Sequence, residues 1–212
     1  RRLQEITIAA REGGGDPESN PRLRQAIANA KSANMPSDNI TRAIKKGTGE
    51  LPGVNYEETI YEGYGPAGVA IMMACLTDNK KRTVANIRHL ITKYGGNLGE
   101  NGSVSWMFDK KGQITLKANS VDEEKVFEDA LEVGAEDFEV DGDFIIISTD
   151  PSDIMSVLDA LEEKGYEVES ANIDMVPKNL QNVDSDKEQS VITLLEALED
   201  HDDIKAVFTN FD

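Results

Sequence analysis

Residues 138–148 have the sequence FEVDGDFIIIS, two short apolar stretches joined by Asp141-Gly142. An Asp-Gly pair between aromatic and β-branched residues is a strong signal for a tight β-hairpin. Amphipathic helices are predicted on either side of this hairpin, at residues 121–133 and 151–164, because apolar side chains recur there every three or four positions. Outer strands are predicted at residues 113–117 and 168–175, and the whole has the order β-α-β-β-α-β. This is the ferredoxin-like arrangement, which we expect to occupy residues 110–177.

The first 48 residues are predicted to form three short helices around one small core. Gly13-Gly14-Gly15 ends the first helix, and Asn20 is expected to cap the second with Pro21 at its first position. Ser37 is expected to cap the third helix and Gly47 to end it. We therefore assign residues 1–50 to an N-terminal helical bundle.

A second sheet is predicted between the bundle and the ferredoxin-like region. Residues 56–61 and 69–76 are expected to be strands, joined by Gly63-Tyr64-Gly65-Pro66 as a hairpin connection. A helix is predicted at residues 80–94 and a further strand at 103–108. The residues expected to be buried on that helix are Val84, Ile87, Ile91 and Tyr94.

The C-terminal part contains a predicted helix at residues 190–198 and a predicted strand at 204–210. A lone helix and strand cannot bury their apolar faces, so we expect them to complete the second sheet. Residues 51–109 plus 178–212 would then form a discontinuous α/β domain with the ferredoxin-like domain inserted in it. The expected fold class is α+β with three domains.

The charge is distributed unevenly along the chain. The net charge is −18, yet residues 1–50 carry nine Lys and Arg against six acids, a net +3. Residues 110–176 carry five bases and nineteen acids. Such asymmetry favours a nucleic-acid or membrane-surface contact on the basic side. The acidic ferredoxin-like region should repel nucleic acid, and it would help to keep the protein in solution or would meet a basic protein partner.

No enzyme motif is found in the sequence, and we expect no catalytic residue, cofactor or metal site. Gly63-Tyr64-Gly65-Pro66-Ala67-Gly68 matches the G-x-G-x-x-G pattern, but the following residues predict a strand where a dinucleotide site needs a helix. Asp200-His201-Asp202-Asp203 is more typical of a solvated helix end than of a cation site. The single cysteine, Cys75, favours a reducing compartment, so we expect a cytoplasmic, non-membrane protein.

The basic side chains most suited to phosphate contact lie on predicted helices. Arg24 and Lys31 share one flank of the second helix, and Arg42, Lys45 and Lys46 are placed away from the core on the third. Arg82, Asn86, His89 and Lys93 form a solvent stripe on the helix at residues 80–94. The complete predicted phosphate-binding set is Arg22, Arg24, Lys31, Arg42, Lys45, Lys46, Lys80, Lys81, Arg82 and Lys93.

Several strings of the sequence resemble those of the YebC/PmpR family, which includes the mitochondrial translational activator of cytochrome oxidase. These strings cover essentially the whole chain at consistent spacing. They are Gly13-Gly14-Gly15-Asp16-Pro17, Asn20-Pro21-Arg22-Leu23-Arg24, Tyr61-Glu62-Gly63-Tyr64-Gly65-Pro66, Asp78-Asn79-Lys80-Lys81-Arg82-Thr83-Val84, Gly95-Gly96-Asn97-Leu98-Gly99 and Gly102-Ser103-Val104. The resemblance implies a helical N-terminal domain and two α/β domains, one inserted in the other. Because the first residue is Arg1, we expect a basic segment to precede it, as in full-length members.

The resemblance also implies a role in gene expression. Family members are described as DNA-binding transcriptional regulators or as ribosome-associated factors that relieve stalling on proline-rich stretches. The leading hypothesis is a non-enzymatic DNA-binding transcriptional regulator. The alternatives are a translation factor that contacts ribosomal RNA and a protein-interaction module that acts through the acidic region.

Overall fold

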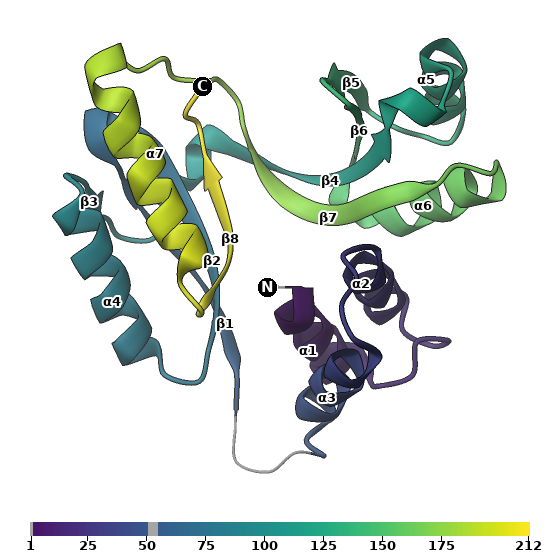
Figure 1. Ribbon diagram of the computed structural model, residues 1–212, viewed down its shortest axis with the longest axis horizontal. Coiled ribbons are helices and arrows are strands. Elements are labelled where there is room, and N and C mark those ends of the chain that lie inside the picture. Colours follow the sequence, from purple (N-terminus) through teal and green to yellow (C-terminus); the bar gives the residue numbers. More distant parts are fainter. Residues whose placement is uncertain (1, 51–54) are drawn as a thin grey trace. The chain divides into compact units, whose positions relative to one another are not determined.

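The computed structural model describes residues 2–50 and 55–212. Its contacts group these residues into two compact units, one formed by residues 55–109 and 175–212 and the other by residues 2–50 and 110–174. Each unit has its own sheet and its own core, and Figure 1 labels their helices and strands. The α+β fold class predicted from the sequence is confirmed.

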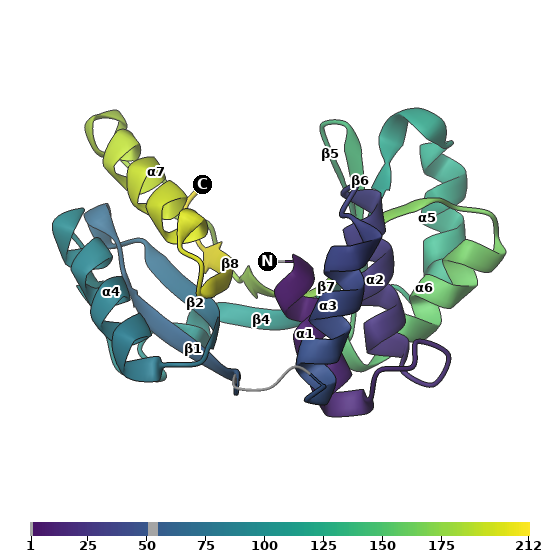
Figure 2. The ribbon, with the colours of Figure 1, turned by 60° about the horizontal axis from the view of Figure 1, so that its bottom comes forward.

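The second unit contains the ferredoxin-like arrangement. Its sheet has the strand order β5-β6-β4-β7, and α5 and α6 lie on the same side of it (Figure 2). The bounds are β4 Phe108–Lys117, α5 Glu123–Glu132, β5 Asp137–Asp141, β6 Phe144–Thr149, α6 Ile154–Glu163 and β7 Val168–Pro177. The strands β5 and β6 form the predicted hairpin, and Gly142 in its turn has a φ of +57°. Alternate residues of β4 and β6, including Ile114 and Ile147, are fully buried against Val126 of α5 and Leu161 of α6.

The helical bundle consists of α1 (Arg2–Gly13), α2 (Pro21–Ser32) and α3 (Ser37–Thr48). As predicted, Asn20 caps α2: its side chain accepts a hydrogen bond from the Leu23 N–H at 3.1 Å. The predicted cap at Ser37 is wrong, because α3 follows Pro36 and has no side-chain cap.

The predicted helix end at Gly47 is also wrong. α3 continues to Thr48 and ends at Gly49, which has a φ of +82°. Gly47 instead lies where α1 and α3 approach closely, since a Cβ built there would stand 2.3 Å from the Thr7 carbonyl oxygen. The glycine therefore serves helix packing rather than helix termination.

The bundle also contacts the ferredoxin-like sheet of the same unit. The side-chain amide of Asn29, on α2, donates a hydrogen bond to the Ala171 carbonyl oxygen of β7 at 3.0 Å. Its Oδ1 atom accepts a hydrogen bond from the Ala171 N–H at 3.3 Å. Asn29 and Ala171 are both buried, so this two-way pairing satisfies polar groups that would otherwise be costly to bury.

The first unit contains a sheet with the order β3-β1-β2-β8. Its elements are β1 Glu57–Tyr64, β2 Ala70–Thr77, α4 Lys80–Lys93, β3 Asn97–Leu98, α7 Ser185–Asp200 and β8 Ile204–Thr209. The predicted return of the C-terminal helix and strand is confirmed, because β8 pairs with β2 and Leu194 of α7 is fully buried in the same core as Ile71. In Figure 1, α4 and α7 lie on the same side of this sheet.

Some sequence predictions for this unit need correction. The predicted strand at residues 103–108 is wrong: residues 105–107 form a short 3-10 turn, and β4 begins at Phe108. The predicted hairpin connection at Gly63-Tyr64-Gly65-Pro66 begins too early, since β1 continues to Tyr64 and residues 65–69 form the turn. On α4, Ile87 and Ile91 are buried as predicted, whereas Val84 and Tyr94 are half-buried. Thr83 is fully buried on that helix.

Among the described residues, no helix is long and apolar enough to cross a membrane.

Candidate nucleic-acid interface

Arg24 and Lys31 lie on the free flank of α2. Both side chains are exposed. At 100° per residue, each lies about 140–160° around the helix from Asn29, the residue that binds β7. The two cations are therefore directed away from the sheet that the bundle covers.

The third helix presents a second group of cations. Ile40 and Ala43 are buried in the bundle core, and Arg42 and Lys45 are exposed on the opposite side. Lys46 is half-buried on the same helix. Lys45 and Lys46 also stand in the last turn of α3, where positive charge complements the helix dipole.

The predicted cations differ in whether their charge is already paired. Within residues 2–50 and 55–212, the side chains of five of them have no hydrogen-bond, ion-pair or aromatic-ring partner: Arg24, Lys31, Arg42, Lys45 and Lys81. Arg22 is paired with Glu5 at 2.8 Å and also with Glu12, and Lys46 has an interaction partner. An unpaired cation can bind a phosphate without first breaking an ion pair with a carboxylate. The unpaired residues are therefore the better candidates for phosphate binding.

Arg82, Asn86, His89 and Lys93 are all exposed on α4. The Lys93 ammonium lies 5.3 Å from the centre of the Tyr94 ring, and Lys80 pairs with Glu57 at 3.2 Å. The Lys80–Glu57 pair is a surface ion pair, which is worth about 0–1 kcal/mol, so Lys80 can exchange this partner for a phosphate.

Arg82 has a structural role. Its guanidinium binds Asp78 at 2.8 Å and Asp203 at 3.3 Å, and these carboxylates raise its pKa. Asp203 also accepts a hydrogen bond from the Thr83 hydroxyl at 2.8 Å. These contacts join the start of α4 to the turn between α7 and β8.

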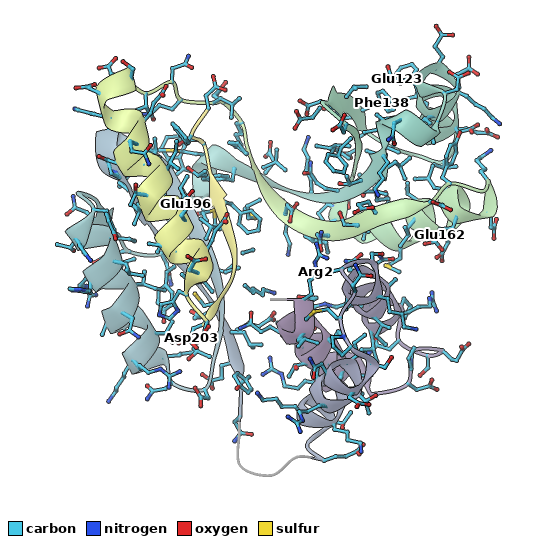
Figure 3. All side chains as sticks on the ribbon, in the orientation of Figure 1. Arg2, Glu123, Phe138, Glu162, Glu196 and Asp203 are labelled. Atoms are coloured by element: carbon cyan, nitrogen blue, oxygen red, sulfur yellow. The ribbon has the colours of Figure 1, made fainter. Side chains whose placement is uncertain are left out.

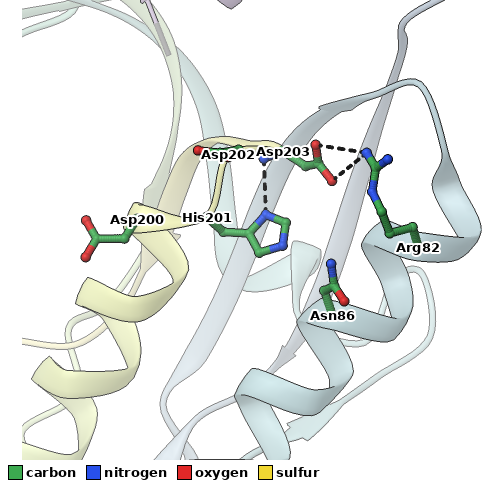
Figure 4. A pocket seen from close by; sticks show the side chains of 6 residues that line it. All are labelled: Arg82, Asn86, Asp200, His201, Asp202 and Asp203. Atoms are coloured by element: carbon green, nitrogen blue, oxygen red, sulfur yellow. Dashed lines mark hydrogen bonds and ion pairs between the residues drawn. The ribbon is translucent and has the colours of Figure 1, made fainter.

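A polar pocket of 360 Å³ lies beside this ion pair (Figure 4). Its lining residues are Arg82, Asn86, Asp200, His201, Asp202 and Asp203. His201 accepts a hydrogen bond at Nδ1 from the Asp203 N–H at 3.1 Å. With three aspartates to one arginine, the pocket disfavours phosphate. Among the described residues, no group of three or more His, Cys, Asp or Glu side chains has the geometry of a metal site.

Sequence reasoning missed a hydrogen-bonded loop that brings together three of the strings quoted above. The buried Glu62 carboxylate of β1 accepts hydrogen bonds from the backbone N–H groups of Gly102 at 2.7 Å, Val104 at 3.1 Å and Ser105 at 2.7 Å. Burial alone raises the pKa of Glu62, but these bonds and one from the Ser105 side chain outweigh it and lower the pKa. Next to them, β3 pairs with β1 through Gly63 and Leu98.

This loop presents Trp106, the one tryptophan of the chain. Its side chain is 65% exposed, and its indole N–H donates a hydrogen bond to the Ser103 carbonyl oxygen at 3.0 Å. An exposed, oriented aromatic ring can stack on an unpaired base or fill a pocket of a protein partner. The sequence does not signal this exposure, because the adjacent Ser105 is held by a hydrogen bond to Glu62, 43 positions away.

By its fold, this is an α+β protein in which a three-helix bundle with exposed cations accompanies two sheet-based modules. Residues 1–50 match the TACO1/YebC protein N-terminal domain, and residues 56–211 match the TACO1/YebC second and third domain. The chain belongs to the TACO1/YebC family.

Similar proteins are found in bacteria. A probable transcriptional regulatory protein of Dictyoglomus turgidum is 54% identical over 99% of this chain and 84% of its own length. A protein of the same name from Treponema denticola is 53% identical over 99% of this chain and 85% of its own length. The crystal structure of a conserved hypothetical protein from Aquifex aeolicus has a TM-score of 0.93 at 49% identity, covering all of this chain and 87% of that one.

Proposed function

We propose that this protein is a non-enzymatic, nucleic-acid-binding regulator of gene expression that acts as a DNA-binding transcriptional regulator. The observation that carries the proposal is the set of exposed cations on α2 and α3 that have no partner in the described part of the chain: Arg24, Lys31, Arg42 and Lys45. We call this set the bundle cations. The names of the relatives, probable transcriptional regulatory proteins, support the same role.

Phosphate contact fits this arrangement for electrostatic reasons. The protein as a whole carries a net charge of −18, so nucleic acid must approach a surface where the local charge is positive. The bundle cations are exposed and do not need to break an internal ion pair. Lys81, which is also unpaired, and Lys80 supply a secondary contact on α4.

The experiment measures affinity for a DNA duplex and for an rRNA fragment over a series of salt concentrations. The test variant is Arg42→Gln with Lys45→Gln, and the control is Lys125→Gln, at an exposed lysine of the acidic region. We expect the slope of log affinity against log salt to fall by about 1 for each phosphate contact that is lost, and the control to change nothing. An affinity that does not depend on salt, or an equal loss in the control, would contradict the proposal.

The second candidate function is a translation factor that contacts ribosomal RNA, and Trp106 favours it. Unpaired bases of RNA stack on exposed aromatic side chains, whereas the bases of a DNA duplex are already stacked on each other. Fluorescence of the single tryptophan reports this contact directly. Quenching by the rRNA fragment and not by the duplex, together with crosslinking in cells that recovers rRNA and no chromosomal DNA, would favour the translation factor over the transcriptional regulator.

A further inference from the structure

The edge of the ferredoxin-like sheet exposes a group of apolar side chains that the proposed function does not use. Phe127 and Leu131, one turn apart on α5, are 45% and 53% exposed, and Val140 on β5 is 43% exposed. The half-buried Phe138 contacts Phe127 edge to face, with ring centres 5.4 Å apart. We call these four residues the apolar edge.

The register of the sheet places the two apolar residues of β5 on one face. Phe138 pairs with Ile147 and Val140 with Ile145, both of which are fully buried under the helices. Phe138 and Val140 thus lie on the face of β5 that α5 covers, and Phe127 of α5 contacts Phe138. Figure 3 labels Phe138 on β5 and Glu123 at the start of α5.

Acidic residues surround the apolar edge. Residues 123–143 hold ten acids and one base, Lys125. On β5 itself, Asp137, Glu139 and Asp141 alternate with the two apolar residues, and all three acids are exposed. They occupy the opposite face of the strand, because successive side chains of a strand point to opposite faces.

β5 is the terminal strand of its sheet. In the order β5-β6-β4-β7 it has β6 on one side, and no other strand of the described chain pairs with it. A terminal strand offers backbone N–H and C=O groups on its free side, to which an extended segment can pair. The β5 edge of a second copy of this chain is not expected to pair with this strand, since two strongly acidic edges would repel each other.

We propose that the free side of β5 binds an extended, basic segment of a partner protein in which apolar and basic residues alternate. The alternation follows from β5: side chains next to Phe138 and Val140 must be apolar, and those next to Asp137, Glu139 and Asp141 must be Lys or Arg. Backbone hydrogen bonds to β5 would provide the affinity for the segment, and the alternation of apolar and basic side chains would provide the specificity. This inference does not depend on nucleic-acid binding, which concerns other residues.

The experiment uses the whole chain labelled with nitrogen-15 and a synthetic peptide, acetyl-Arg-Val-Lys-Ile-Arg-Val-Lys-amide. Two peptides serve as controls: one has the same composition with its apolar and basic residues in separate blocks, and one has Glu in place of each base. We expect the alternating peptide to shift the amide resonances of β5 and α5 and to bind at least about tenfold more tightly than either control, a difference of about 1.4 kcal/mol.

Variants locate the contact. Glu139→Lys and Val140→Lys should each weaken binding of the alternating peptide by about tenfold, whereas Glu167→Lys, at an exposed acid outside this edge, should leave it unchanged. Glu139 is exposed, so its variant is expected to fold even if Val140→Lys does not. Four results would each overturn the proposal. They are binding of the block peptide as tight as that of the alternating peptide, equal weakening by Glu167→Lys, resonance shifts away from α5 and β5, and self-association of the chain through this edge.

Discussion

The Glu62 carboxylate of β1 accepts a hydrogen bond from the Ser105 backbone N–H at 2.7 Å, across 43 positions of the sequence. This contact, with those to Gly102 and Val104, holds a loop in the place where the sequence predicts a strand. The loop in turn orients Trp106 toward solvent. A buried charge is costly unless it is hydrogen-bonded, and three backbone N–H groups meet that requirement here.

Glu62→Ala should lower the free energy of unfolding by about 1–3 kcal/mol, because three backbone N–H groups lose their acceptor. The Trp106 fluorescence should also shift, since the loop that holds the indole loses its anchor. Urea titration followed by circular dichroism measures the first effect and the emission maximum measures the second. Glu100→Ala, at an exposed carboxylate of the neighbouring loop, is the control. An unchanged emission maximum in Glu62→Ala would show that the loop does not depend on Glu62.

The lowered pKa of Glu62 predicts a contribution of this group to acid sensitivity. Its pKa in the folded state lies below the ordinary value of 4.5, so its stabilising effect is fully present above that pH. The effect is lost as the pH falls through the folded-state value. Glu62→Gln does not titrate, so the difference in unfolding free energy between wild type and Glu62→Gln should be constant above the ordinary value and shrink below it. A difference that grows in acid would contradict the prediction.

Gly47→Ala should destabilise the helical bundle, although alanine is normally the better helix former. A Cβ at residue 47 would lie 2.3 Å from the Thr7 carbonyl oxygen and 2.8 Å from the Ala10 Cβ. The helices α1 and α3 would have to separate, at a cost of about 1–3 kcal/mol. Thermal unfolding of Gly47→Ala and of Thr41→Ala, an exposed position on the same helix, measures the difference. A gain of stability in Gly47→Ala, as at an open helical site, would disprove the close packing.

Asn29→Ala should weaken the contact between the bundle and β7. It removes both the donor to the Ala171 carbonyl and the acceptor for the Ala171 N–H, leaving buried backbone groups unpaired at a cost of about 1–3 kcal/mol. Hydrogen exchange of the Ala171 amide should accelerate. Ser32→Ala, at an exposed position of the same helix, is expected to leave exchange and stability nearly unchanged. Slow exchange at Ala171 in Asn29→Ala would mean that another acceptor serves this amide.

The predicted phosphate-binding residues illustrate how far a sequence can locate a site. Helical spacing placed Arg24, Lys31, Arg42 and Lys45 on exposed flanks, and each of them is exposed. Spacing could not show that Arg22 and Arg82 differ from these residues in being already paired with carboxylates. Their partners, Glu5 and Asp203, lie on other elements. An ion pair between distant segments forms only when the chain folds, so no local pattern reveals it.

The sequence by itself determined most of the regular elements and their order, because burial imposes a period of 3.6 on a helix and of 2 on a strand. These periods predicted the α+β class, and residue types at the element ends predicted the hairpin at Asp141-Gly142 and the cap at Asn20. The tertiary structure alone decided three features: the packing of α1 against α3 at Gly47, the short turn at residues 105–107 and the exposure of Trp106. These features depend on contacts between residues far apart in the chain, such as Thr7 with Gly47 and Glu62 with Ser105, and contacts of that kind leave no local repeat in the sequence.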